Sequence, residues 1–190
     1  MPLEFNSNLL TDRVEFKLYA AERHLNNLKE MQLNYSNIEN DNQVVQIELE
    51  IDCFLAQILG AVDCLLILIN TRLELGIATG KVDLATVQSA LNARTKSISL
   101  LTELHQALER DRWLWTLMEF RNQTMQGPSI QEEAILLDDN TMSLRSRYQN
   151  SSIVNSNEFN GINLISYFEQ SVKRVRDLVN TIRMKEPLLK

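Results

Sequence analysis

The chain has 190 residues, of which 44% are hydrophobic and 23% charged, and its formal net charge is −6. These values are typical of a globular protein, exclude wholesale disorder and fibrous repeats, and predict a single domain over residues 1–190. With only 5 Gly and 3 Pro, the chain lacks the turn residues that a sandwich or barrel of many short strands requires. The negative charge also argues against a surface that wraps duplex nucleic acid, although a local basic patch is compatible with it.

Apolar residues recur at helical spacing in two long segments of the N-terminal half. The first segment covers residues 14–35 and follows Thr11, which can cap its start. The second covers residues 41–69 and carries two adjoining apolar stripes, which predicts a central helix buried on most sides. Asp63 interrupts its most apolar part, residues 53–69. We therefore expect a core helix rather than a membrane span, and no association with a membrane.

Two further helical segments are expected before residue 127. The central helix should stop near residues 76–80, and Asp83 can cap a short third helix after it. The polar residues 94–97 indicate a break or a kink, after which the apolar spacing resumes and continues to about residue 126. Gly127-Pro128 ends this helix, because proline has no N–H to donate and disfavours helical geometry in the residue before it.

Residues 129–161 break the helical pattern. Within them, residues 134–137 and 143–148 fit two short strands of a hairpin, and an irregular loop is an equal alternative. The helical spacing returns at Leu164 and predicts a last helix that reaches about residue 186. The predicted fold class is therefore all-α, an antiparallel bundle of four to five helices with a small β-hairpin or an irregular loop before the last helix.

The cysteines and histidines argue against several kinds of site. Cys53 and Cys64 lie in one predicted helix, about 16 Å apart along its axis, which is too far for a disulfide within the chain and fits a reducing, cytoplasmic location. His24 and His105 fall in different helices without metal-ligand spacing. Glycine-rich phosphate loops, nucleophile elbows and zinc-protease signatures are also missing from the sequence. We expect no metal and no cofactor.

Two charged residues fall on apolar sides of their predicted helices. Asp63 has mainly apolar neighbours one and two turns away, so its carboxylate is expected to be largely buried and to need a donor or a cation. Arg121 is flanked at helical spacing by a leucine and two methionines. The two side chains are candidate partners, and such a pair is an indication of a site. The alternative is that Arg121 extends to the surface and Asp63 bonds a neighbouring side chain.

The segment around Arg121 carries a family resemblance. The order of elements, with a long apolar second helix and a final helix after a polar loop, resembles the HEPN superfamily of small helical bundles. Many members of that superfamily carry the motif Arg-Asn-x-x-x-His. In this chain Arg121 and Asn122 match the first two positions, and Gln126 stands where the histidine would be. The resemblance covers most of the chain in topology, and its motif covers six residues.

The HEPN resemblance implies a function that this chain meets only in part. Members of that superfamily are often metal-independent ribonucleases that dimerise so that arginine and histidine from both chains face a shared cleft, and others bind RNA, nucleotides or proteins without cleaving. Histidine would move protons there while arginine holds the phosphate. Gln126 does not titrate near neutral pH and cannot take that role. We therefore expect a cytoplasmic homodimer that binds a phosphate-bearing ligand, RNA or a nucleotide, or a partner protein, without catalysis.

Two alternatives stay open beside this reading. One is a metal-independent endoribonuclease of a toxin–antitoxin or defence system, and the other is a purely structural protein–protein interaction module. The last helix matters for any reading that involves a phosphate, because its polar side carries Lys173, Arg176 and Arg183. These residues could form a basic approach to a phosphate, although a solvated cationic face is the commoner explanation of such a pattern.

Overall fold

We describe a computed structural model of the chain, over residues 7–34, 41–94, 98–108, 113–126, 135–138, 141–144 and 163–189. The described part contains six α-helices: α1 Arg13–Asn34, α2 Asp41–Arg72, α3 Leu84–Arg94, α4 Ile98–Leu108, α5 Trp113–Gln126 and α6 Leu164–Lys185. Three short 3-10 turns, Ser7–Leu10, Thr79–Lys81 and Pro187–Leu189, adjoin them. The all-α bundle is confirmed, with one helix more than expected because α4 and α5 are separate.

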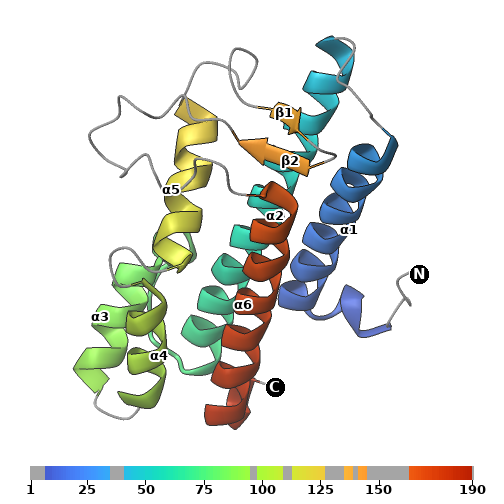
Figure 1. Ribbon diagram of the computed structural model, residues 1–190. Helices are drawn as coiled ribbons and strands as arrows, with labels where there is room; N and C mark the ends of the chain where they lie inside the picture. Colours follow the sequence, from blue (N-terminus) through green and yellow to red (C-terminus); the bar gives the residue numbers. More distant parts are fainter. Residues whose placement is uncertain are drawn as a thin grey trace.

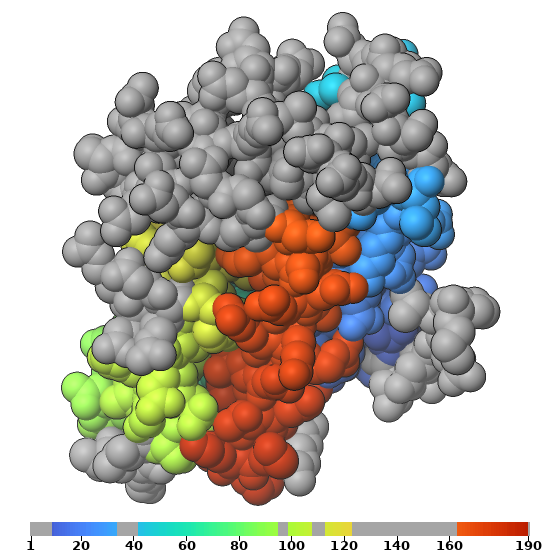
Figure 2. Space-filling view, viewed as in Figure 1, coloured from blue at the N-terminus to red at the C-terminus, as the bar shows by residue number. Residues whose placement is uncertain are grey.

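The long helix α2 runs from the top to the lower part of the molecule, with α1, α5 and α6 packed beside it (Figure 1). The pair α3 and α4 occupies one lower corner, where both pack near the ends of α2 and α6 (Figure 1). On the face shown in Figure 2, α6 lies between α1 on one side and α4 and α5 on the other. This arrangement places α2 behind α6, in the interior that its apolar stripes predict.

A small hairpin precedes α6. Strand β1, Ile135–Asp138, pairs antiparallel with β2, Thr141–Leu144, in a register that sets Ile135 opposite Leu144 and Asp138 opposite Thr141. The structure thus has the hairpin rather than the irregular loop. Strand β1 begins one residue after the expected position 134, and β2 begins two residues before the expected position 143. The remaining residues of the 129–161 segment lie outside the described part of the chain.

Three phenylalanines join α2, α5 and α6 at the centre of the core. Phe54, Phe120 and Phe168 are fully buried. The rings of Phe54 and Phe168 stack with centroids 4.1 Å apart, and the ring of Phe120 lies 6.1 Å from that of Phe168. Aromatic rings packed at these separations contribute large apolar areas and a preferred geometry. They fix α5 against α2, and this orientation positions the residues that follow Phe120.

The helix α2 also meets a membrane-span criterion by length and composition. The segment of residues 42–72 is long and apolar enough to cross a bilayer. Half of its most apolar 18-residue stretch is buried inside the bundle. The core helix of a globular protein passes the same test. Both apolar stripes predicted for this helix contribute to the core, from Ile47 at one end to Ile69 at the other.

Candidate functional site

The predicted pair Arg121 and Asn122 lies near the end of α5. Leu117 and Phe120 anchor this helix in the core, which leaves the next two residues half-buried at its edge. The Nη2 of Arg121 donates a hydrogen bond to Oδ1 of Asn122 over 3.2 Å. The Nε of Arg121 is buried. The Asn122 side chain uses its Oδ1 to accept this hydrogen bond from the guanidinium. Its two amide N–H groups do not take part in that bond and can donate to other groups.

Asp63 lies on α2 in the electrostatic range of Arg121, but it is not largely buried as its neighbours in the sequence predicted. Its side chain is exposed, as are those of Ala56 two turns before it and of Ile67 one turn after it on the same side of the helix. Desolvation by the surrounding chain nevertheless raises the pKa of the Asp63 carboxyl above its ordinary value, and the cations of Arg121 and Lys17 act in the opposite direction. The charge of Arg121 therefore influences Asp63, and a direct pair between the two side chains stays a prediction.

Lys17 brings a second cation to this side of α2. Its Nζ donates a hydrogen bond to Oε1 of Gln57 over 2.8 Å, which holds the α1 side chain against α2. Gly60 leaves room for this crossing, because a Cβ atom built at that position would lie 3.4 Å from both Cδ and Cε of Lys17. We call Lys17, Gln57, Asp63, Arg121 and Asn122 the α2 edge cluster. It gathers donors and charges from α1, α2 and α5.

Gln126 is the last residue of α5. Its backbone is helical, and it follows Asn122 by four residues, which is one turn of an α-helix. The conformation of its side chain lies outside the described part of the structure. The helical spacing nevertheless associates position 126 with Asn122 more closely than with Arg121.

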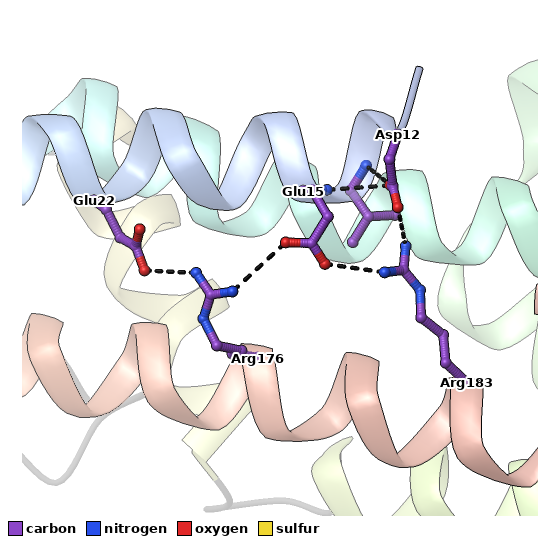
Figure 3. Close-up of polar contacts among 6 residues, drawn as sticks. Asp12, Glu15, Glu22, Arg176 and Arg183 are labelled. Carbon is purple, nitrogen blue, oxygen red and sulfur yellow. Dashed lines mark hydrogen bonds and ion pairs between the residues drawn. The ribbon is translucent and has the colours of Figure 1, made fainter. Parts of the chain in front are cut away.

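The basic residues of α6 have a different role from either of those considered for the sequence. Arg176 bonds Glu22 over 2.6 Å and lies 3.5 Å from Glu15, while Arg183 bonds Glu15 over 2.9 Å and Asp12 over 2.7 Å (Figure 3). These α1–α6 pairs form a continuous row in which each guanidinium lies between two carboxylates. Carboxylates therefore engage Arg176 and Arg183 within the chain.

Lys173, the third residue of the predicted basic approach, is exposed on α6. It precedes Arg176 by three residues, about one helical turn. Of these three residues, only Lys173 would meet an approaching phosphate with its charge available. The charges of Arg176 and Arg183 are already compensated by carboxylates of the chain.

Sequence reasoning missed the acidic half of this row, although a signal for it exists. Glu15 and Glu22 are seven residues apart on α1, and Arg176 and Arg183 are seven residues apart on α6. Residues at this spacing lie on one face of a helix after two turns. Equal spacing of opposite charges on two apolar-faced helices would have predicted their antiparallel pairing.

A second polar cluster ties the middle of α1 to the first half of α2. Nδ1 of His24 lies 2.7 Å from Oε2 of Glu50, and the amide of Asn27 donates to Oε1 of the same carboxylate over 3.1 Å. These residues are partly buried and satisfy one another. In the described ranges, no group of three or more His, Cys, Asp or Glu side chains could hold a metal ion.

Both cysteines of α2 are free thiols with partly exposed side chains. Desolvation raises the pKa of Cys53, and the carboxylates of Glu50 and Asp52 add to that effect. Desolvation also raises the pKa of Cys64, against the opposing charges of Lys17 and Arg13. A raised pKa keeps both side chains in the weakly nucleophilic thiol form at neutral pH.

No protein-family model, no curated protein and no solved structure matches this chain. The functional interpretation therefore depends on the α2 edge cluster itself and on the motif resemblance of Arg121 and Asn122.

Proposed function

We propose that the protein is a non-catalytic, HEPN-like binding protein that takes the phosphate of an RNA or a nucleotide at Arg121 and Asn122. The hydrogen bond from Arg121 to Asn122 is the observation that carries this proposal. It holds a guanidinium and a primary amide side by side at the rim of α5. Guanidinium and amide N–H groups are donors that suit phosphate oxygens.

The electrostatic setting of the α2 edge cluster supports an anionic ligand. Arg121 and Lys17 both act on the exposed carboxylate of Asp63 from different helices. Desolvation disfavours the ionised form of the Asp63 carboxyl, and the charges of the two cations favour it. A phosphate that approaches Arg121 would compete with Asp63 for the guanidinium, and protonation of Asp63 would relieve their repulsion.

The proposal is non-catalytic because no histidine stands at the motif position that would transfer protons at neutral pH. An attack by the RNA 2′-hydroxyl needs a general base, and histidine is the usual one. Gln126 cannot titrate, His24 is bonded to Glu50, and His105 belongs to α4 rather than α5. The resemblance also implies a homodimer in which two copies of Arg121 share one cleft, and we include this dimer in the proposal.

Binding of a fluorescently labelled, mixed-sequence RNA, followed by anisotropy at low and at physiological salt, tests the proposal. Arg121→Ala should weaken binding by about tenfold, the usual effect of losing one charge-assisted contact. The matched control is Arg23→Ala, because Arg23 is an exposed arginine of α1 outside the cluster. Equal affinities for the two variants would overturn the proposed site.

The same RNA distinguishes the ribonuclease alternative. Wild-type protein should leave it uncut, and cleavage that disappears in Arg121→Ala would replace our proposal by the endoribonuclease. Gln126→His adds a further arm, because activity gained there would identify a family site that lacks only its acid–base residue. A protein that neither binds nor cuts RNA would favour the interaction module, which the exposed apolar side chains of Leu33, Val45 and Leu49 could serve.

A further inference from the structure

A hollow of about 660 Å³ lies where the start of α1, the last turns of α2 and the C-terminal end of the chain meet. Its volume is in the range of small-molecule binding sites. It is separate from Arg121, which contributes nothing to its wall. The residues that line it are Thr11, Asp12, Arg13, Val14, Cys64, Ile67, Leu68, Thr71, Arg72, Arg183 and Leu189.

One wall of the hollow is apolar. Val14 and Leu189 are buried beneath it, and Leu68 is partly buried. Ile67, a large aliphatic side chain in the last turns of α2, is 39% exposed. Covering this apolar surface would remove it from water, which favours the binding of an apolar group. The wall therefore favours a ligand with a hydrocarbon or aromatic body.

The rim of the hollow is positively charged, in a chain whose net charge is −6. Asp12 neutralises Arg183 through their 2.7 Å pair. Two arginines remain: Arg13, whose guanidinium lies 4.6 Å from the ring centre of Phe16, and Arg72 at the C-terminal end of α2. In the part of the chain that the structure describes, neither of these two forms an ion pair with a carboxylate.

We infer that this hollow is a binding site for a small amphipathic anion, an apolar body with one carboxylate-like head group. The apolar body lies against Ile67 and Leu68, and the head group bonds Arg13 or Arg72 at the rim. The hydroxyl of Thr71 is a further donor there. This inference does not depend on the phosphate-binding function proposed for Arg121.

The two cysteines of α2 provide a direct test with an internal control. Cys64 lines the hollow and Cys53 does not, and both are partly exposed thiols on the same helix. The purified protein is treated with N-ethylmaleimide at mildly alkaline pH, with and without decanoate, and the modification of each cysteine is followed by mass spectrometry. Decanoate at about ten times its Kd should slow the modification of Cys64 about tenfold and leave that of Cys53 unchanged.

Variants and a neutral probe separate the head-group contact from apolar binding alone. Decanol, which lacks the charge, should protect Cys64 at least about tenfold less well at equal concentration. Arg72→Glu should reduce protection by decanoate to a similar extent, whereas the control Arg174→Glu, at an exposed arginine of α6, should not.

Three results would overturn the inference. Equal protection of Cys53 and Cys64 would indicate a global effect of decanoate on the fold. No protection of either cysteine would exclude this ligand class from the hollow, and unchanged protection in Arg72→Glu and with decanol would exclude recognition of the anion. Arg121→Ala should retain full protection, so failure here is distinguishable from failure of the phosphate site.

Discussion

Nη2 of Arg183 lies 2.7 Å from Oδ2 of Asp12, a residue 171 positions earlier in the chain. The same Asp12 caps α1, because its Oδ1 accepts hydrogen bonds from the backbone N–H groups of Val14 and Glu15. One carboxylate thus begins the first helix and fixes the last helix against it. The row of ion pairs that continues through Glu15, Arg176 and Glu22 extends this link along both helices (Figure 3).

Removing Arg183 should destabilise the protein more than removing Arg176. The Arg183 side chain is 17% exposed and bonds two carboxylates, whereas that of Arg176 is 40% exposed. We expect Arg183→Ala to lower the free energy of unfolding by about 2 kcal/mol, between the values for surface and buried pairs, and Arg176→Ala by less than about 1 kcal/mol. Urea unfolding measures both, with Arg174→Ala as the control. A larger loss for Arg176→Ala would contradict this ranking.

Two substitutions of Asp12 separate its two roles. Asp12→Asn retains an oxygen that can cap α1 but loses the charge that pairs with Arg183. Asp12→Ala loses both, so it should be less stable than Asp12→Asn by about 1 kcal/mol, the usual contribution of a helix cap. Urea unfolding again provides the comparison. Equal stability of the two variants would show that the cap contributes nothing.

The pKa of Asp63 reports on the geometry of the α2 edge cluster. Desolvation raises it, and Arg121, followed by Lys17, lowers it. Arg121→Gln should therefore raise this pKa further, and Lys17→Gln should raise it by less. Titration of the carboxyl carbon by NMR measures both shifts, with Arg23→Gln as the control. An unchanged pKa in Arg121→Gln would show that Arg121 does not face Asp63.

The raised pKa of Asp63 also sets the sign of its effect on stability. This effect falls in the pH window between the ordinary pKa of an aspartate and the raised pKa of Asp63. In that window the folded protein holds a proton on Asp63 that the unfolded chain releases. Its contribution to stability is therefore largest below this window and is lost as the pH rises through it. Asp63→Asn cannot ionise, so it should gain stability relative to wild type as the pH rises across the window. Urea unfolding at several pH values checks this, and a relative loss would contradict it.

Gly60 offers a test of how closely α1 and α2 are packed. Alanine favours a helix over glycine by about 0.5–1 kcal/mol. The atoms nearest to an added methyl group belong to the flexible end of Lys17, at 3.4 Å. Gly60→Ala should therefore stabilise the protein by up to about 1 kcal/mol in urea unfolding. A destabilisation of similar size would mean that the Lys17–Gln57 hydrogen bond cannot adjust.

The sequence predicted helices well where an apolar stripe meets the core. Both stripes of α2 are buried because their spacing follows the helical repeat, which is a local property. The division between α4 and α5 was not predicted, because apolar residues on either side of the charged residues 109–112 fit one continuous repeat.

The prediction for Asp63 failed for a physical reason. Its neighbours along α2 are apolar, but Ala56 and Ile67 among them are themselves exposed. A helix can carry apolar residues on a side that no other helix covers, and only the tertiary structure determines which side that is. For the same reason, sequence spacing alone could not distinguish a solvated Arg176 or Arg183 from one paired with α1.

The most direct test of the phosphate site is an NMR titration of the protein with a nucleoside monophosphate and a short RNA. The Nε–H signal of Arg121 and the side-chain amide signals of Asn122 should shift and saturate together, while the Nε–H signals of Arg23 and Arg174 stay in place. Equal small shifts of all exposed arginines, or no shift at Arg121 at saturating RNA, would contradict a binding site at Arg121 and Asn122.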